Sequence, residues 1–271
     1  MIAAGRTGSA PHARMRPFLR QQAWFACLFA ALVLACWAAL WAWSASPYAR
    51  YLDHPGWRDA ASFAAFCRAI AVPASVHALV WVLMIGAMML PTSYPLLAMF
   101  RRVTGHRSDG AWLAALVAIG FVLAWMVFGV LAYLADGAVR AWAAQSAWFV
   151  VHGSLVAAFV LAAAGVFQFS ALKYRCLEKC RAPFAFIASR WHGRAPAREA
   201  LRLGLGHGAY CVGCCAPLML VMFVVGMGSI GWMLALAALM AIEKNVPAGR
   251  HVRTPLGIAL IGWATYLVAA S

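Results

Sequence analysis

One apolar segment of the chain opens with the sequence Gly206-His207-Gly208-Ala209-Tyr210-Cys211-Val212-Gly213-Cys214-Cys215-Ala216-Pro217-Leu218-Met219. Three of the eight cysteines of the chain stand here within five positions. If the stretch is helical, Cys211, Cys214 and Cys215 occupy positions i, i+3 and i+4 and share one face of the helix. His207 lies one turn before them and Met219 one turn after. The stretch therefore predicts a stripe of soft metal ligands along a single helix.

A second pair of thiols precedes this stretch. Cys176 and Cys180 stand at i and i+4, and 30 residues separate Cys180 from Cys211. A segment of that length can fold back, so the two thiol groups are expected at the same membrane face, where thiolates favour Cu(I), zinc or an iron–sulfur cluster. The nearby basic residues that favour the thiolate form are Lys173, Arg175, Lys179 and Arg181. The alternative is that these cysteines are small apolar fillers, as we expect of Cys27 and Cys36.

The composition indicates a membrane protein with several spans. The chain is 65% hydrophobic and only 11% charged, which is far from the balance of a soluble protein. Its 22 Lys and Arg residues exceed its 7 Asp and Glu residues by 15, an excess that suggests nucleic-acid binding in a soluble chain. In a membrane protein the same excess marks cytoplasmic loops, so no nucleic-acid partner is expected.

Apolar runs of about 20 residues, the length that crosses a bilayer, predict seven helical spans. They lie near 23–45, 74–100, 111–135, 146–169, 209–227, 229–243 and 255–271. The expected fold is an all-α transmembrane helical bundle, a single domain over 23–271 that follows a basic N-terminal segment at 1–22. Six spans are the alternative, because 229–243 is short enough to be re-entrant or interfacial.

The basic residues predict which loops face the cytoplasm. The N-terminal segment and residues 101–110, 170–208 and 244–254 together hold 18 of the 22 Lys and Arg residues. By the positive-inside rule these segments are cytoplasmic, and 170–208 forms a basic cytoplasmic loop. The thiols are then expected at the cytoplasmic face of the lipid bilayer, with the N-terminus on the same side.

A second set of candidate ligands lies within the predicted spans. It consists of His77, Met84, Met88, Met89, His152 and Met222. An ionisable residue inside a span is a functional candidate, and thioethers bind Cu(I), so the set predicts an intramembrane Met/His path. The alternatives are that the histidines ligate a haem, or that the methionines fill packing gaps while the histidines bond to neighbouring helices.

Three prolines predict breaks in the helices. Pro91 and Pro95 are expected to bend or end the second span, and Pro217 is expected to kink the helix of the thiols. Glu243, near the end of the sixth predicted span, is expected to form a salt bridge. The chain carries no P-loop, Gly-x-Ser-x-Gly or His-Glu-x-x-His motif, so the sequence does not support a hydrolytic enzyme. A binding role is expected rather than catalysis.

The thiol motifs resemble those of a bacterial family described as predicted metal-binding integral membrane proteins. The resemblance covers about 75–245 and rests on Gly86-Ala87-Met88-Met89-Leu90-Pro91, Cys176-Leu177-Glu178-Lys179-Cys180, Tyr210-Cys211-Val212-Gly213-Cys214-Cys215, Trp232-Met233 and Glu243-Lys244. It implies a multi-span protein of the inner membrane that binds a metal, often presumed to be copper. The chain departs from the family pattern at Ala216, where an aromatic residue is common, and at Lys179, where a histidine is common.

These observations lead to one preferred hypothesis and two alternatives. The chain is expected to bind Cu(I), with zinc as the other candidate metal, and to deliver or translocate it in contact with a metalloenzyme or metallochaperone. The primary ligands would be Cys176, Cys180, Cys211, Cys214 and Cys215, with His207 and Met219 auxiliary. The alternatives are a membrane thiol–disulfide oxidoreductase that uses Cys211 and Cys214, and a scaffold subunit with a structural zinc ion.

Overall fold

The computed structural model describes residues 11–47, 49, 72–145, 152–226 and 228–270. Within these residues every regular element is helical, so the expected all-α fold is confirmed. The elements are α1 (Pro11–Ser44), α3 (Ala74–Met84), η2 (Ile85–Met89), η3 (Pro91–Ser93), α4 (Tyr94–Val103), α5 (Gly110–Gln145), α7 (Gly153–Phe167), α8 (Ala171–Arg181), α9 (Pro183–Ala188), α10 (Pro196–Val225), α11 (Ile230–Asn245), η4 (Pro247–His251) and α12 (Arg253–Ala269).

Four segments of the described chain are long and apolar enough to cross a membrane. They are Gln22–Ser44, Gly110–Ala143, Pro196–Val225 and Pro247–Ala269. Two bent helix pairs raise the number to six if each counts as one span: Ala74–Met89 with Pro91–Val103, bent by 44°, and Gly153–Phe167 with Ala171–Arg181, bent by 62°. The range of four to six agrees with a helical bundle, whereas the expected number of seven spans stays a prediction.

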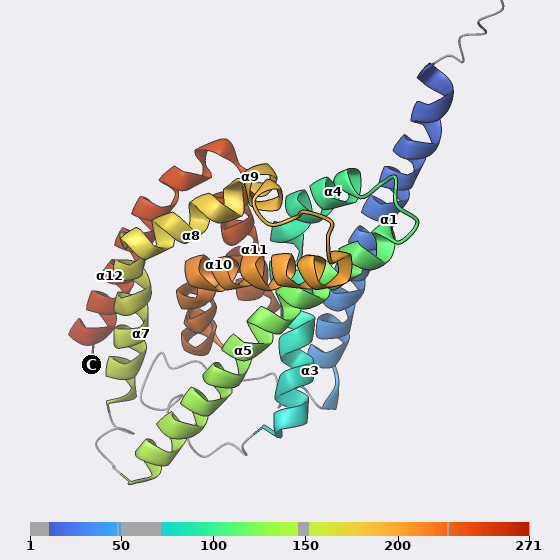
Figure 1. Cartoon of the computed structure of the whole chain (residues 1–271). Coiled ribbons are helices and arrows are strands. Elements are labelled where there is room, and N and C mark those ends of the chain that lie inside the picture. The colour runs from blue at the N-terminus through green and yellow to red at the C-terminus, as the bar shows by residue number, and fades with distance from the viewer. Residues whose placement is uncertain (1–10, 48, 50–71, 146–151, 227, 271) are drawn as a thin grey trace, which may run out of the picture.

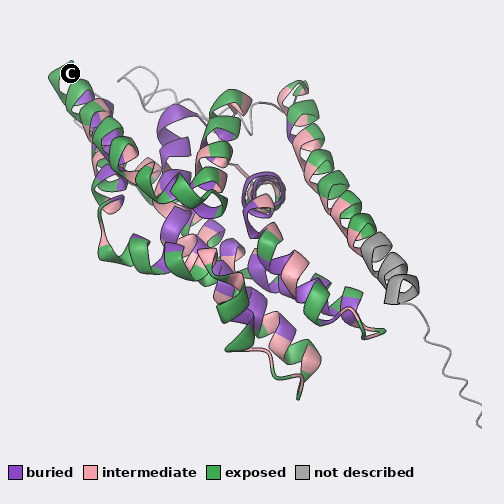
Figure 2. Ribbon diagram, turned by 90° about the horizontal axis from the view of Figure 1, so that it is seen from above, coloured by how far each residue is buried: buried purple, intermediate pink, exposed green. Residues whose placement is uncertain are grey.

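Helix α10 lies at the centre of the bundle and crosses α5, while α7 and α12 pack side by side at one edge (Figure 1). The buried residues gather in the middle of the molecule, and the long outlying helix α1 carries mainly exposed and intermediate positions (Figure 2). Gly204 allows α10 to approach α5 closely, because a Cβ atom there would lie 2.0 Å from the backbone oxygen of Val117. Small residues at such crossings are typical of membrane helix pairs.

The second predicted span is broken, as Pro91 and Pro95 led us to expect. Helix α3 passes into the π-helix η2, whose wider turn is closed by a bond of 2.8 Å from the amide of Leu90 to the carbonyl of Ile85. Pro91 then begins η3, and Pro95 lies in the first turn of α4. Single π-helical turns are frequent at functional sites, and all five residues of η2 are buried.

Much of the predicted basic loop 170–208 is helical. It contains α8 and α9, and α10 begins at Pro196, well before the span expected from 209. The Glu199 side chain explains this early start, because its carboxylate accepts backbone N–H bonds of 2.7–3.1 Å from His192, Gly193, Arg194 and Ala195. A proline at the first helical position is also favourable, since it has no N–H to leave unpaired.

The structure bears on two further expectations about single residues. Helix α10 continues through Pro217 to Val225 as one element, so the proline does not end the helix that carries the thiols, and the kink expected there stays a prediction. Its missing N–H leaves the carbonyl of Gly213 without the usual helical donor, but packing by neighbouring helices maintains the element. His152 was expected within the fourth span, yet it is the N-cap of α7, and residues 146–151 of that predicted span lie outside the described residues.

Candidate thiol site

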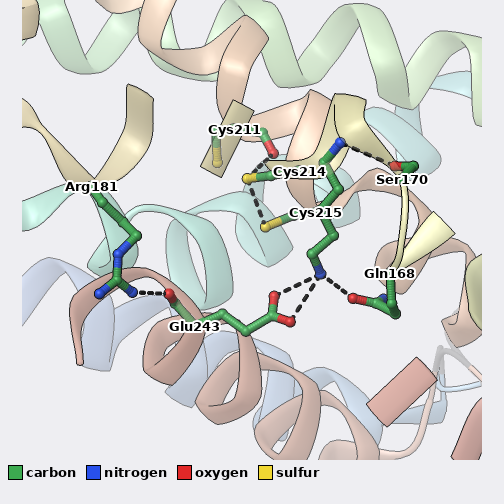
Figure 3. Close-up of polar contacts among 8 residues, drawn as sticks. Gln168, Ser170, Arg181, Cys211, Cys214, Cys215 and Glu243 are labelled. Carbon is green, nitrogen blue, oxygen red and sulfur yellow. Dashed lines mark hydrogen bonds and ion pairs between the residues drawn. The ribbon is translucent and has the colours of Figure 1, made fainter. Parts of the chain in front are cut away.

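Four thiols follow one another in space across the contact between α10 and α8. Cys211, Cys214 and Cys215 are buried on α10, and the Sγ atoms of Cys214 and Cys215 are 3.5 Å apart (Figure 3). The thiol of Cys215 also interacts with that of Cys211. From α8, the thiol of Cys180 interacts with Cys214. The order Cys211, Cys215, Cys214, Cys180 is called the thiol chain below.

Cys176, the remaining predicted ligand on α8, lies beside the thiol chain and packs against α10. A Cβ atom at Gly213 would lie 2.6 Å from its Sγ atom, so this thiol occupies the space that a side chain would fill. Gly213 therefore sets how closely α8 approaches the thiols of α10. The structure thus brings all five predicted cysteine ligands to one helix contact.

The ammonium group of Lys244 lies at one end of the thiol chain. Its Nζ atom donates hydrogen bonds to Cys211 Sγ at 2.7 Å and to Thr92 Oγ1 at 3.1 Å. The indole Nε1 of Trp125 on α5 also donates to Cys211 Sγ, at 3.3 Å. Cys211 is therefore a sulfur acceptor between two buried donors, an arrangement suited to a thiolate.

Two of the four predicted basic neighbours of the thiols, Lys173 and Arg181, bond to groups other than sulfur. Lys173, fully buried, donates to both carboxylate oxygens of Glu243, at 2.9 and 2.8 Å, and to Gln168. This ion pair confirms the salt bridge expected for Glu243 (Figure 3). Arg181 donates to the backbone carbonyls of Glu243 and Pro247. Lys244, which sequence reasoning did not select, is the cation in contact with sulfur.

The sequence signal for Lys244 was its place beside Glu243 in the Glu243-Lys244 motif. Adjacent residues on a helix point about 100° apart, so Glu243 and Lys244 face different neighbours. The sequence predicted a salt bridge for Glu243 and placed Lys244 in the cytoplasmic segment 244–254, whereas the structure directs Glu243 toward α8 and Lys244 toward α10 and η3. Thr92 and Trp125 gave no sequence signal, because their partners lie far away in the chain.

The two auxiliary candidates on α10 are both buried. His207 is 2% exposed, and its ring packs against Phe121 and Phe186 at centroid distances of 5.9 and 5.6 Å. Its Nδ1 atom has no hydrogen-bond partner among the described residues. An unpartnered imidazole nitrogen is free to accept a bond or a metal ion. Met219 is also buried, two turns beyond Cys211 on the uninterrupted helix.

The predicted methionine path starts near the thiol chain. Met84, Met88, Met89 and Met222 are all at most 1% exposed. Thr92 joins the two regions, because its hydroxyl accepts from Lys244 and donates to the carbonyl of Met89 at 2.7 Å. Met233 and Met240 of α11 are equally buried and were not among the predicted path residues. Cys36, for which a packing role was expected, places its thiol against Gly86 of η2, the π-helix that also carries Met88 and Met89.

The two candidate histidines lie on other elements than the thiols. His77 Nε2 bonds to the backbone carbonyl of Gly129 at 3.1 Å, and its ring stacks on Trp81 at 5.6 Å. These contacts fit the structural alternative, in which the histidine joins neighbouring helices. His152 lies at the N-terminal boundary of α7.

Within the described residues, no three His, Cys, Asp or Glu side chains are grouped so that they could hold a metal ion together. The thiols instead follow one another along a helix contact, where successive pairs are adjacent. Such pairs fit a metal with a low coordination number better than a closed tetrahedral site.

Comparison with known protein families gives a match. The family model of PpoB2, described as a copper chaperone, matches residues 78–267. The matched segment contains all five cysteines of the α8–α10 contact, together with Lys244 and the methionines of η2. No curated protein and no solved structure matches the chain.

Proposed function

Because the chain belongs to the PpoB2 family of copper chaperones, we propose that it binds Cu(I) on the thiol chain and passes it to or from the buried methionines. The single observation that carries this proposal is the linear order of four thiols beside Thr92 and Met89. Cu(I) is a soft ion that prefers thiolate and thioether ligands.

The spacing of the thiols supports transfer rather than permanent storage. An ion held by one neighbouring pair can exchange one ligand at a time along the thiol chain, since each thiol has an adjacent thiol as its next partner. The same pathway reaches Cys180 on α8, the thiol of the chain closest to the basic segment that includes Lys179 and Arg181. We place the entry or exit of copper there.

The proposal includes a location and a partner class. The apolar helices and the distribution of basic residues support an inner-membrane protein with its thiols at the cytoplasmic face. A chaperone hands its metal to another protein, so the partner is a metalloenzyme or a second metallochaperone. Copper is cargo in this scheme, and catalysis is not required of the chain.

Copper binding by purified protein tests the proposal. The protein in detergent, kept reduced, is titrated with Cu(I) against a chromogenic Cu(I) chelator. The double variant Cys211→Ser/Cys214→Ser should lose most of the bound copper, because it removes the thiol beside Lys244 and a second thiol from the middle of the thiol chain. The matched control is Cys27→Ser, since Cys27 is an exposed cysteine of α1. Equal copper stoichiometry in the double variant and the wild type would contradict the proposal.

A further inference from the structure

Lys244 is a buried cation whose closest partner is sulfur. It is 5% exposed, and its two hydrogen-bond acceptors in the described residues are Cys211 Sγ and Thr92 Oγ1. The neighbouring carboxylate of Glu243 does not serve it, because both oxygens of that carboxylate bond to Lys173. A buried charge without a carboxylate partner needs another source of compensation.

We propose that Lys244 is the counter-cation of a two-coordinate Cu(I) bis-thiolate that includes Cys211, and that it makes the site selective for monovalent soft metal ions. This inference rests on the proposed Cu(I) function and assigns a specificity role to a residue that does not itself ligate the metal. Lys244 is a positioning residue in this scheme.

The balance of charge explains the selectivity. One Cu⁺ ion and two thiolates carry a net charge of −1, and the ammonium of Lys244 makes the group neutral. Burying a neutral group avoids most of the desolvation penalty that an isolated charge would incur. Zn²⁺ with four thiolates carries −2, so the same lysine leaves one negative charge uncompensated. Ag⁺ has the charge of Cu⁺ and is therefore expected to bind in the same way.

The surroundings keep the ammonium in place. Thr92 lies on η3 and is itself anchored to the carbonyl of Met89, so it holds the Nζ atom at the boundary between thiols and methionines. Trp125 supplies a second donor to the same sulfur from α5. Cys211 is therefore the thiol whose sulfur already accepts from two buried N–H donors, which suits the fixed ligand of the pair. Cys215, whose thiol interacts with that of Cys211, is its candidate partner in the pair.

The test compares metal affinities of the full-length protein in detergent. Lys244→Met keeps much of the side-chain length and removes the charge. It should weaken Cu(I) and Ag(I) binding at least tenfold, with Zn(II) affinity unchanged or increased and copper stoichiometry retained. Lys244→Arg, which keeps the charge, should bind Cu(I) more tightly than Lys244→Met. The matched control is the double variant Lys173→Met/Glu243→Gln, because it removes another buried lysine together with its carboxylate partner and leaves no buried charge unpaired; its Cu(I) affinity should equal that of the wild type.

The outcomes separate this inference from the proposed function. Wild-type protein that binds no Cu(I) would overturn the proposed function, and the inference with it. Wild-type protein that binds Cu(I) while Lys244→Met binds it equally well would overturn the inference alone. X-ray absorption of the wild-type copper complex adds a readout that does not depend on variant folding. Two sulfur neighbours at copper support the inference, and three or four overturn it.

Discussion

At the scale of single residues, the adjacent pair Glu243 and Lys244 organises the interior. One turn of α11 presents a carboxylate to Lys173 on α8 and an ammonium to Cys211 on α10. Both contacts are buried, so water and salt screen them much less than they screen a surface pair. The pair therefore ties α11 to the two helices that supply the thiols, and each charge depends on a partner from another element.

Replacement of Glu243 by Gln should destabilise the protein strongly. It leaves the ammonium of Lys173 buried without a carboxylate, and breaking a buried pair from one side costs about 3–5 kcal/mol. Thermal unfolding in detergent measures the change. Asp109→Asn is the control, because the Arg107–Asp109 pair is partly exposed and its loss should change the unfolding midpoint little. Equal midpoints for Glu243→Gln and wild type would show that the ion pair is not needed.

At the scale of elements, the crossing of α5 and α10 determines where the thiols meet their donors. Gly204 removes a side chain at the point of closest approach. The same approach brings Trp125 of α5 within hydrogen-bonding distance of Cys211. On the opposite side of α10, Gly213 admits Cys176 of α8. Two glycines on one helix thus allow both neighbours of the thiol chain to come close.

A methyl group at Gly204 should therefore disturb both the fold and the site. In Gly204→Ala the Cβ atom meets a backbone oxygen, which cannot rotate away, and overpacking of this kind costs about 1–3 kcal/mol. We expect a lower unfolding midpoint and weaker Cu(I) binding, since α5 and Trp125 must move. Gly137→Ala is the control, because a Cβ atom there has no neighbour within 4 Å among the described residues. Similar losses in both variants would rule out the close crossing as the cause.

At the scale of the whole molecule, the distribution of charge bears on how the bundle is oriented. The basic residues cluster around the segments that carry α8, α9 and the start of α10, next to the thiol chain. The outer segments of the predicted topology hold only Arg50, Arg58, Arg68 and Arg140. A thiol site on the cytoplasmic side stays reduced, which suits metal binding better than disulfide exchange.

Reporter fusions should place these segments on opposite sides of the membrane. A reporter enzyme that is active only outside the cytoplasm is expected to be inactive when fused after residue 191, between α9 and α10. The same reporter is expected to be active after residue 145, at the end of α5. The reverse pattern would put the thiols at the outer face, contradict the positive-inside assignment and favour the thiol oxidoreductase alternative.

The sequence by itself determined the features that depend on local spacing. Apolar runs predicted the helices, Pro91 predicted the break in the second span, and the spacing of Cys211, Cys214 and Cys215 predicted that they share one face. Helix geometry relates such residues directly, since neighbours at i+3 and i+4 lie together in any α-helix. The resemblance to metal-binding proteins also rested on these local motifs, and the copper chaperone family agrees with it.

Only the tertiary structure decided which side chains meet across elements. Lys244 reaches Cys211 over 33 positions and Thr92 over 152, and His77 finds its acceptor 52 positions away. No periodicity encodes such contacts, because they follow from how helices pack against one another. The thiol stripe was therefore visible in the sequence, whereas its counter-cation and its link to the methionines appeared only in the folded bundle.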